Sequence, residues 1–517
     1  MKSSIYNMDK LWSDKEKRGY TPLLDNEKIR IAFLFQSPPY WPSWESFYRA
    51  CLTDGRFDAR LVLLDMTGPY LNRIAAAERF LIEENLGFTR FSEFDIERHK
   101  PHVVVMQTPY DDWHRLPSAY STRIRRLGAR IVYIPYGIEF ADTANARLSH
   151  FHTFTVLNAW RIYVLSDLMK KEYRDNCPNR EAVRVCGYPR FDFYTNRQRF
   201  RLPEALEQRI GSRKVVAWKM HFPKTNYNNG QWVTVTPDID EYIRFTEKIP
   251  GFNDLFFIFM PHPNIINGDY PRQFHPQIET LMKKLRGMEN IYIDEADDYR
   301  PSILRAQAMI TDRSALMIEA AVTGIPILYL HNPDNMEKLT EAVAPLVDSF
   351  YQGTTADDMA RFIEQFISGN DPQKENREEA FRLCVPYTDG KCGERIANDI
   401  AGSIISEMPD EICRIAVFGM ADVFRYYWDS LAALRADGVE ISVIADNNEK
   451  LWGTEYNGIP VVDPMTLREY EFDFLVVFTE QHYRDIFRQL VYEVNIDMDK
   501  IMRLDRFLLA TDVKNHI

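Results

Sequence analysis

The sequence predicts an α/β protein made of three doubly wound domains, each built around a mostly parallel sheet. Short apolar runs alternate with segments of helical spacing along most of the chain. Continuous apolar runs of this kind are typical of strands buried on both faces of a parallel sheet. Turn-forming Gly, Pro, Asn and Asp residues follow the runs. A length of 517 residues also exceeds what one core normally holds, which indicates several domains.

The first domain is predicted over residues 28–195, after a polar leader at residues 1–27. The leader carries charge throughout and lacks the apolar segment of a signal peptide, so we expect a cytoplasmic protein. The strands expected in this domain are KIRIAFLFQ (28–36), RLVLLDM (60–66), HVVVMQTPY (102–110) and ARIVYIPYG (129–137).

The second domain is predicted over residues 196–408, and the third over residues 409–517, after the helix-breaking segment EMPDE. Both show the same alternation of strand and helix. The second is expected to end in the helical segment DGKCGERIANDIAGSIIS. Its expected strands are KVVAWKMHF (214–222), DLFFIFMPHP (254–263), NIYIDEA (290–296), QAMITD (307–312) and IPILYL (325–330). The third domain's strands are expected in CRIAVFGMADVF, VEISVIADNN, GIPVVD and FDFLVVFTE.

Composition excludes several classes of protein. The chain is 45% hydrophobic and 27% charged, and no stretch approaches the length of an apolar membrane span. A formal net charge of −12 disfavours a nucleic-acid partner. The six cysteines contain no C-x-x-C pair, so neither a zinc site nor a disulfide framework is indicated. We expect a globular protein whose cysteines are reduced packing residues.

Polar residues gather where strands of the second domain end. Asp312, Arg313 and Ser314 follow the strand AQAMI, and His262 and Asn264 follow LFFIFM. In open α/β sheets, ligands bind beyond the carboxyl ends of the strands, where helices begin and favour anions. Capping of a helix by Asp312 or Ser314 is an equally open interpretation. A structural role for a single His at a strand end is also common.

Glu319 lies inside an otherwise apolar helix, five residues after Ser314. A buried carboxylate is costly without a partner. It therefore meets either a ligand hydroxyl or a buried donor, and we favour the ligand.

Four segments, in this order, resemble motifs of the CDP-glycerol glycerophosphotransferase family, the teichoic-acid and capsule polymer enzymes. The resemblance covers about residues 30–400, and four spaced motifs are more specific than any one of them. The segments are CGYPRFD (186–192), HPN (262–264), ITDRSALMIEAAVTGIPILYL (310–330) and YTDGKCGERIANDI (387–400).

The resemblance implies a GT-B fold of two Rossmann-like domains, an N-terminal acceptor domain and a C-terminal nucleotide-donor domain. It implies transfer of glycerol phosphate, or a related polyol phosphate, from a CDP-activated donor to an acceptor hydroxyl, with release of CMP and no metal. His262, Asp312 and Ser314 would bind or polarise the donor phosphates, and Glu319 would meet the ribose. Asn264 and Arg190, which lie in the matching motifs, are further donor-binding candidates.

This chain departs from the family at several positions. Arg313 stands where the family has an aromatic residue, and Ala315 replaces its second Ser, so one phosphate contact is lost or moved. Tyr136 stands where many members carry a catalytic loop His.

The identity of the general base is therefore open. Candidates are Glu139 in the same loop, Asp111 or Asp112 on the acceptor side, and His221, which resembles a family strand end and which we favour. The alternative role for Tyr136 and Glu139 is an ordinary loop contact. The alternative for the segment QSPPYWPSW (36–44) is an aromatic lid or a packing cluster. His221, His262 and Glu139 form the predicted catalytic set.

The third domain resembles Rossmann-like modules attached to sugar-modifying enzymes of surface polysaccharide pathways. Its first loop keeps Gly419 of a G-x-G-x-x-G pattern, but Ala421 and Phe424 stand at the second and third glycine positions. Side chains there would obstruct a pyrophosphate. We expect no NAD and predict a docking or regulatory module.

Two other functions remain open from sequence alone. One is a GT-B glycosyltransferase that uses a nucleotide sugar for surface polysaccharide, because fold does not fix function. The other is a non-catalytic, nucleotide-binding scaffold of a polymer-assembly complex. For the transferase we expect a lipid-linked or polymeric acceptor and peripheral contact with the inner face of the cell membrane. The donor's polyol and the oligomeric state are not readable.

Overall fold

The first sheet is a seven-stranded, parallel sheet in the order β3-β2-β1-β4-β5-β6-β7. The order reverses between β1 and β4, which is the topological switch of a doubly wound sheet. The predicted strands of the first domain are confirmed within a few residues. The strands are β1 (Ile29–Phe35), β2 (Phe57–Leu63), β3 (Thr89–Arg90), β4 (Val103–Met106), β5 (Arg130–Tyr133), β6 (Arg161–Val164) and β7 (Val183–Val185).

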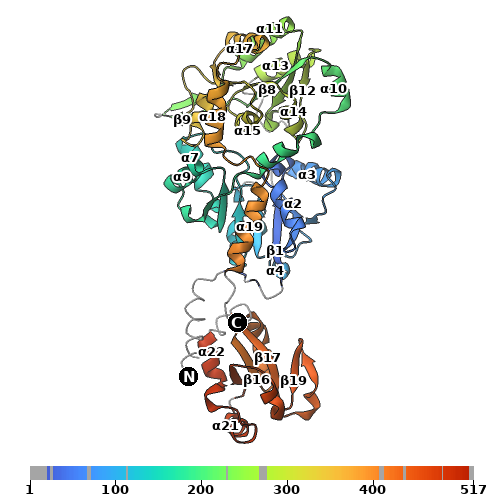
Figure 1. Ribbon diagram of the computed structural model, residues 1–517, viewed down its shortest axis with the longest axis vertical. Coiled ribbons are helices and arrows are strands. Elements are labelled where there is room, and N and C mark those ends of the chain that lie inside the picture. Colours follow the sequence, from blue (N-terminus) through green and yellow to red (C-terminus); the bar gives the residue numbers. More distant parts are fainter. Residues whose placement is uncertain are drawn as a thin grey trace. The chain divides into compact units, whose positions relative to one another are not determined.

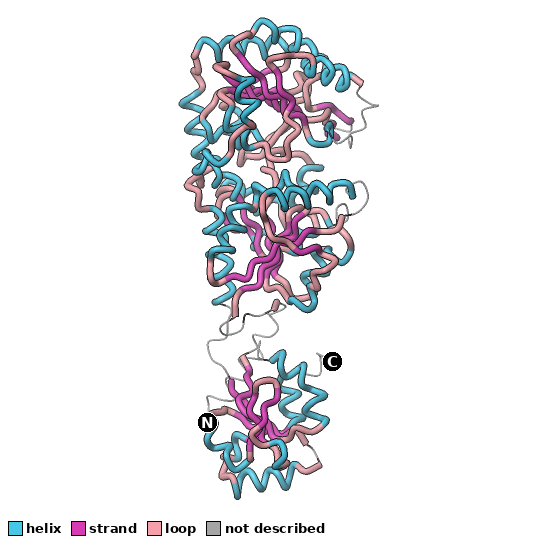
Figure 2. The backbone as a smooth tube through the Cα atoms, turned by 90° about the vertical axis from the view of Figure 1, so that its right-hand side faces the viewer, coloured by secondary structure: helices cyan, strands magenta, loops and turns pink. Residues whose placement is uncertain are grey.

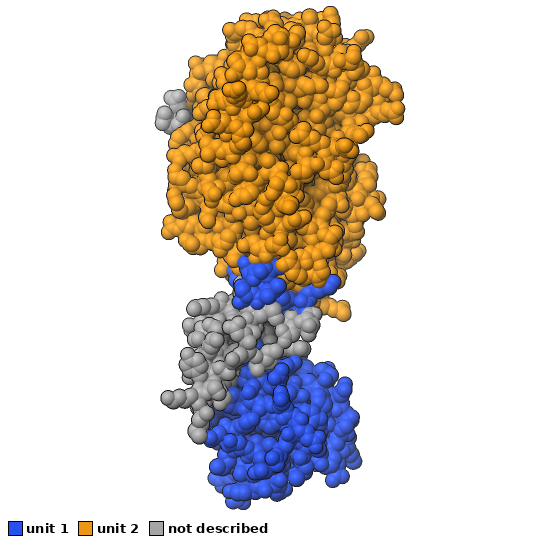
Figure 3. All heavy atoms as spheres, in the orientation of Figure 1, with its two compact units in different colours: residues 1–28, 401–517 blue, residues 29–400 orange. Residues whose placement is uncertain are grey.

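This computed structural model separates into two units, residues 29–400 and residues 1–28 with 401–517 (Figure 3). Most of the predicted leader lies outside the described residues. The structure describes residues 20–21, 23, 27–66, 71–111, 115–228, 231–266, 276–406, 413–434, 438–479 and 481–511.

Short helices connect the strands of the first sheet. Figure 2 shows strands gathered in the middle, with helices around them. The α-helices are α2 (Glu45–Thr53), α3 (Leu71–Glu83), α4 (Ile96–His99), α6 (Ser121–Arg126), α7 (Ala144–Phe151), α8 (Phe154–Asn158) and α9 (Asp167–Asn176). The 3-10 helices are η1 (Pro38–Ser43), η3 (Pro117–Ala119) and η4 (Arg180–Ala182).

The second sheet has six parallel strands in the order β12-β11-β8-β13-β14-β15, and its core lies between these strands and α11, α13 and α17. The five predicted strands are confirmed, and β9 pairs antiparallel with β10 beside them. The strands are β8 (Lys214–Met220), β9 (Thr225–Asn228), β10 (Gln231–Thr234), β11 (Leu255–Pro261), β12 (Ile291–Ile293), β13 (Ala308–Thr311), β14 (Ile327–Leu330) and β15 (Tyr351–Gly353).

The helices of the second half include two short ones at the strand ends, α12 and α15. The α-helices are α10 (Glu204–Ile210), α11 (Ile239–Lys248), α12 (Pro263–Ile266), α13 (Gln277–Arg286), α14 (Arg300–Arg305), α15 (Leu316–Ala320), α16 (Ala344–Asp348), α17 (Ala356–Ser368) and α18 (Lys374–Cys384). The 3-10 helices are η6 (Ile249–Gly251) and η8 (Ala321–Thr323).

The two halves of residues 29–400 are joined by the 3-10 helix η5 (Pro189–Arg199) and by α19 (Cys392–Ile405). The Asp192 carboxylate accepts hydrogen bonds from the backbone N–H groups of Cys392 (3.0 Å) and Gly393 (2.9 Å). Gly187 has φ +77°, and a Cβ there would lie 2.6 Å from the Cys392 sulfur. Two of the segments that carry the resemblance therefore meet each other at the crossing.

Helix α19 lies beside α2 and β1 of the first half (Figure 1), although the sequence prediction groups its residues with the second domain. Tyr163 of β6 donates a 2.7 Å hydrogen bond to Asp399. A Cβ at Gly393 would lie 2.4 Å from the Ser46 backbone carbon, so only glycine allows this approach. The chain thus returns to its first half after completing the second.

The third sheet, in the order β18-β19-β17-β16-β20-β21, confirms a third α/β domain. It is mixed, because β18 runs antiparallel to β19. Its strands are β16 (Cys413–Phe418), β17 (Val439–Ala445), β18 (Thr454–Tyr456), β19 (Ile459–Val462), β20 (Phe474–Val477) and β21 (Ile501–Arg503). Its helices are α20 (Asp422–Leu434), η10 (Glu449–Leu451), η11 (Pro464–Glu469), α21 (Tyr483–Arg488), η12 (Gln489–Glu493), η13 (Met498–Lys500) and α22 (Leu504–Thr511).

The predicted obstruction of the first loop of this domain by the Phe424 side chain is wrong. Phe424 has no exposed surface and packs against Trp428 and Phe478, so it fills the core and does not lie in the loop. The loop amide of Met420 instead donates to the Asp446 carboxylate at 2.7 Å.

All six cysteines are buried free thiols, as expected from their spacing. Within the described part of the chain, no helix is long and apolar enough to cross a membrane.

Candidate active site

A cavity of about 680 Å³ lies at the carboxyl ends of the two parallel sheets of residues 29–400 and is lined by both halves. This is where an open α/β sheet exposes its ligand site. Eight of the predicted site residues line the cavity. They are Tyr136, Arg190, His221, His262, Asn264, Arg313, Ser314 and Glu319.

His221 follows β8 and is held at its backbone. Its N–H donates to both oxygens of Asp312, at 2.8 and 3.0 Å. Its ring Nδ1 lies 2.7 Å from the Phe222 carbonyl oxygen. A carbonyl oxygen can only accept, so Nδ1 carries the proton and Nε2 keeps its lone pair in the neutral ring. His221 therefore offers a proton-accepting edge.

His262 follows β11 and offers the opposite edge. Its Nδ1 lies 3.1 Å from the backbone N–H of Asn264, which donates to it. Nδ1 is therefore unprotonated, and Nε2 carries the N–H in the neutral ring. The ring centroids of His221 and His262 are 4.6 Å apart.

Both imidazoles are neutral near pH 7. Burial, together with the nearby Arg313 charge, lowers the pKa of His221 to about 3. Burial also lowers the pKa of His262 well below its usual value, with His221 adding to the effect. The pair therefore combines one neutral acceptor and one neutral donor in a single cavity.

Asp312 lies behind His221 and does not line the cavity. It has no exposed surface, and its carboxylate also accepts from the Tyr242 hydroxyl at 2.9 Å. Burial raises the pKa of Asp312 to about 7. Both oxygens of Asp312 accept hydrogen bonds from the protein's own groups, and the direct contact of Asp312 with the CDP-activated donor stays a prediction.

Arg313 and Ser314 line the cavity but are also engaged. Arg313 forms a 2.7 Å ion pair with the buried Glu337, and its guanidinium lies 5.0 Å from the centre of the Phe140 ring. The Ser314 hydroxyl accepts from the backbone N–H of Leu316 at 3.3 Å, at the start of α15. The N-cap position of α15 is Ala315, so Ser314 precedes the cap and bonds to the first turn without occupying the cap position.

Glu319 is bound by buried hydrogen-bond donors of the protein, and its contact with the ribose of the CDP-activated donor stays a prediction. One oxygen is paired with the Arg190 guanidinium, and the other accepts from the Tyr299 hydroxyl at 2.5 Å. Arg190 also donates to Ser43 (3.1 Å) and to the backbone oxygen of Tyr136. Burial raises the pKa of Glu319, and Arg190 opposes that shift. This network links η5 to both halves at the cavity.

Glu139 and Asp111 are not among the residues that line the cavity, and their roles as candidate bases stay predictions. The Glu139 carboxylate accepts from the hydroxyls of Tyr173 (2.7 Å) and Tyr188 (3.1 Å), and burial raises its pKa to about 7. Asp111 forms a buried 2.6 Å ion pair with Arg115. Asp112 lies outside the described residues.

Lys219 is a lining residue that the sequence reasoning missed. It belongs to β8 and is 6% exposed, and its ammonium donates to the Pro261 carbonyl oxygen at 3.2 Å. Burial lowers its pKa to about 8, and the charges of Asp312 and Asp294 oppose the shift. A lysine inside the apolar run VVAWKM was the available signal, because a buried ammonium requires a partner.

Lys224 and Arg73 also line the cavity. With Lys219 they are cations that can meet an anion, whereas Asp294, Glu295 and Asp297 add negative charge to the same lining. In the described ranges, no group of three or more His, Cys, Asp or Glu side chains is placed to hold a metal ion.

Residues 158–402 match the family described as CDP-Glycerol:Poly(glycerophosphate) glycerophosphotransferase, and residues 411–502 match the family described as C2185-like, N-terminal. The comparison with curated proteins finds no match.

Solved structures resemble the chain in fold. The complex of S. aureus MnaA with UDP has a TM-score of 0.52 and 14% identity, covering 74% of this chain and 99% of that chain. A Listeria monocytogenes protein assigned as a UDP-N-acetylglucosamine 2-epimerase has a TM-score of 0.51 and 14% identity, covering 74% and 98%. The wall teichoic acid polymerase TagF has a TM-score of 0.47 and 12% identity, covering 78% and 94%.

At 14% identity the first two structures show the fold alone, two Rossmann-like halves in a GT-B-like arrangement. The family match covers the segment that carries both cavity histidines, Lys219 and Glu319. The chain therefore contains a domain of the CDP-glycerol:poly(glycerophosphate) glycerophosphotransferase family, followed by a C2185-like, N-terminal domain.

Proposed function

We propose that this protein is a transferase that moves glycerol phosphate, or a related polyol phosphate, from a CDP-activated donor to an acceptor hydroxyl and releases CMP. The observation that carries the proposal is the family match over residues 158–402, which includes the paired histidines of the cavity. Those histidines, whose ring centroids are 4.6 Å apart, supply a proton acceptor and a hydrogen-bond donor, as transfer to a hydroxyl requires.

In the proposed reaction, the acceptor oxygen attacks the donor phosphorus that bears the polyol. A new O–P bond forms, the bond from that phosphorus to the bridging oxygen breaks, and CMP leaves with the electron pair. The lone pair on Nε2 of His221 takes the acceptor's proton. The low pKa of His221 applies to the ligand-free protein, and the negative donor phosphates favour its protonated form.

We propose that groups of the second half stabilise the negative charge on the departing CMP. The Nε2–H group of His262 donates a hydrogen bond without a net charge, and Lys219 supplies a buried cation from the adjacent strand. Preorganised groups of this kind act strongly because little water competes with them in a buried site. Asp312 supports the reaction indirectly by holding the His221 backbone.

The experiment is to incubate the purified protein with CDP-glycerol or CDP-ribitol and to measure CMP, with and without acceptors. CMP that appears together with a phosphodiester product supports the proposal. Absence of CMP from every CDP-polyol would refute it. Nucleotide release from a nucleotide sugar instead would favour a glycosyltransferase, and donor binding without turnover would favour a scaffold.

The proposed setting is the assembly of a cell-surface polymer such as teichoic acid or capsule. A lipid-linked or polymeric acceptor would bring the protein to the inner face of the cell membrane by peripheral contact.

A further inference from the structure

Two loops, one from each half of the GT-B-like unit, pair with each other beside the cavity. Residues 139–142 lie after β5, and residues 337–341 lie after β14. Ala141 and Leu339 form an antiparallel bridge between the two loops. Gly137, just before the first loop, lines the cavity. We call this pairing the latch, because it joins the two halves through residues other than those of η5 and α19.

The latch is built on backbone groups. The N–H of Asp142 donates to the Lys338 carbonyl oxygen at 2.7 Å, and the N–H of Thr340 donates to the Phe140 carbonyl oxygen at 2.8 Å. The Thr340 hydroxyl donates to the carbonyl oxygen of Glu139 at 2.9 Å. Each bond contributes little net free energy, because the same groups bond to water when the loops part. Side-chain contacts therefore decide how firmly the latch is held.

Two ion pairs of the latch lie in water. Lys338 pairs with Asp142 at 2.5 Å, and the Lys338 side chain is 73% exposed. Lys171 of the first half pairs with Glu341, and these side chains are 45% and 75% exposed. Exposed ion pairs stabilise a contact weakly, because water and salt screen them.

Arg313 reaches both loops of the latch from the cavity lining. Its guanidinium forms the 2.7 Å ion pair with Glu337, whose side chain is 1% exposed. The same guanidinium lies 5.0 Å from the centre of the Phe140 ring, in the loop of the first half. Loss of one partner disturbs a buried pair more than an exposed pair. A cation–π contact adds to the attachment.

The residue type at position 313 matters for this contact. The resembling family carries an aromatic residue there, which could pack against Phe140 but could not pair with a carboxylate at position 337. Arg313 can do both. Glu337 is not among the residues that line the cavity, so its effect on the site passes through Arg313 and the latch.

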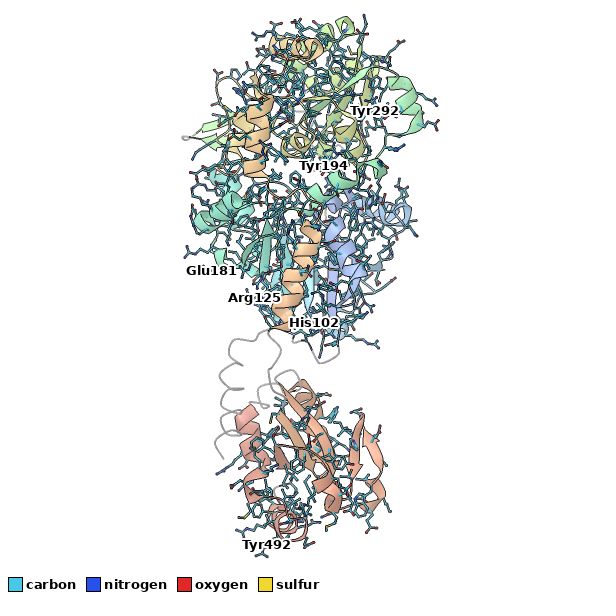
Figure 4. The ribbon with its side chains drawn as sticks, viewed as in Figure 1. His102, Arg125, Glu181, Tyr194, Tyr292 and Tyr492 are labelled. Atoms are coloured by element: carbon cyan, nitrogen blue, oxygen red, sulfur yellow. The ribbon has the colours of Figure 1, made fainter. Side chains whose placement is uncertain are left out.

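The crossing at η5 and α19, where Tyr194 of η5 is labelled in Figure 4, is held by buried contacts. The Asp192 carboxylate, in a residue that is 6% exposed, accepts from two backbone N–H groups of α19. The Arg190–Glu319 pair beside it is 4% and 0% exposed. Separation of the halves is therefore easier at the latch than at the crossing, which acts as the hinge.

We propose that Arg313 is a positioning residue. Together with Glu337 and Phe140 it holds the latch closed and so keeps the first half against the cavity that contains His221 and His262. For its effect on the reaction, the inference rests on the proposed function. A loosened latch populates an open form, and the apparent affinity for the CDP-activated donor then falls in proportion to the closed fraction.

The first experiment measures hydrogen–deuterium exchange by mass spectrometry in the full-length chain. In Arg313→Gln and Glu337→Gln, peptides that contain the Asp142 and Thr340 amides should exchange about 3- to 10-fold faster than in wild type. The peptide that contains the Cys392 amide, at the crossing, should keep its wild-type rate. Wild-type exchange at the latch in both folded variants would overturn the inference, and so would equal acceleration at the latch and the crossing.

Lys171→Met is the matched control, because it breaks an exposed ion pair of the same latch. Its effect on exchange should stay below about 2-fold. Acceleration as large as that in Arg313→Gln would contradict a special role for Arg313. Thermal unfolding shows whether each variant is folded, and the more conservative Glu337→Gln decides the question if Arg313→Gln is not.

The second experiment measures CMP release from CDP-glycerol. Glu337→Gln should raise the KM for CDP-glycerol about 3- to 10-fold and leave kcat within about 2-fold of wild type, because saturating donor closes the latch. An unchanged KM in a variant whose latch exchanges faster would overturn the positioning role. Failure of the wild-type protein to release CMP from any CDP-polyol would count against the proposed function, whereas the exchange experiment requires no activity and still tests the latch.

Discussion

His221 and His262 face the same cavity from adjacent strands and present opposite hydrogen-bonding edges. Their ring centroids are 4.6 Å apart. The Phe222 carbonyl fixes the proton of His221 on Nδ1, and the Asn264 N–H fixes the lone pair of His262 on Nδ1. One neutral ring can therefore accept a proton while the other donates a hydrogen bond.

His262→Gln should therefore retain more activity than His262→Ala, because a Gln side-chain amide still donates a hydrogen bond. For His221, neither Gln nor Ala supplies a comparable base, and both should lower kcat about 10²- to 10⁴-fold. The measurement is the initial rate of CMP release at saturating donor. If Gln restores activity at position 221 but not at 262, the two roles are reversed.

Lys219→Met should weaken donor binding about 10- to 100-fold, because a charge-assisted hydrogen bond to phosphate is lost. Calorimetric titration of CDP-glycerol measures the Kd. Lys214→Met is the control, since Lys214 is exposed at the other end of the same strand. An unchanged Kd for Lys219→Met would exclude a phosphate contact.

Wild-type donor affinity should also fall as the pH rises through about 8, where the ligand-free Lys219 loses its charge. The charged groups that oppose this loss are Asp312 and Asp294. Bound phosphate stabilises the ammonium and moves the transition in the complex to higher pH. The slope of log Kd against pH should be smaller in Lys219→Met than in wild type. Equal slopes would assign the pH dependence to another group.

Asp312→Ala should lower the free energy of unfolding by about 1–3 kcal/mol for each buried donor that it leaves unpaired. The donors are the His221 N–H and the Tyr242 hydroxyl. Tyr242→Phe removes one of the two bonds and should cost less. Urea unfolding measures stability, and the KM for the CDP-activated donor distinguishes a structural role of Asp312 from a direct contact with that donor. A large rise in KM with unchanged stability would support the predicted direct contact.

Arg190→Met or Glu319→Gln should each lower the free energy of unfolding by about 3–5 kcal/mol, because each leaves a buried partner uncompensated. Both side chains are nearly fully buried, at 4% and 0% exposed. The double variant should recover part of the loss. Additive losses in a double-mutant cycle measured by urea unfolding would show that the pair is not coupled.

Glu139→Gln should change the pH dependence of stability. The folded pKa of Glu139 is about 7, above the usual 4.5, so the folded state binds more protons between these values. Its stabilising contribution is therefore complete below about pH 4.5 and is lost as the pH rises through about 7. The free energy of unfolding, measured in urea at about pH 5 and about pH 8, should be higher in the variant relative to wild type at the higher pH. Glu181→Gln, at an exposed site (Figure 4), is the control, and an identical change there would refute the assignment.

Local sequence pattern was sufficient for the central strands of each sheet and for part of the site, whereas shorter strands such as β3, β7 and β15 were not predicted. Runs such as IRIAFLF (29–35) and LFFIFMP (255–261) are apolar throughout because the sheet buries both of their faces. The residue that ends each strand then lies at the ligand edge, so His221, His262 and Ser314 were found without a structure. Their neighbours in sequence, Arg313 and Asn264, also reach the cavity.

Only the tertiary structure decided which polar side chains are available to a ligand. In sequence, Asp312 is a candidate for binding the CDP-activated donor and Glu139 is a candidate base. In the structure, His221 and Tyr242 donate hydrogen bonds to Asp312, and Tyr173 and Tyr188 donate to Glu139. The role of a carboxylate depends on the hydrogen-bond donors that folding places opposite it. Those donors belong to residues that lie tens of positions away in the chain. The same reason hid the proximity of Tyr40, Tyr110 and Tyr136 in the cavity lining, because they become neighbours through the order of β1, β4 and β5 in the sheet.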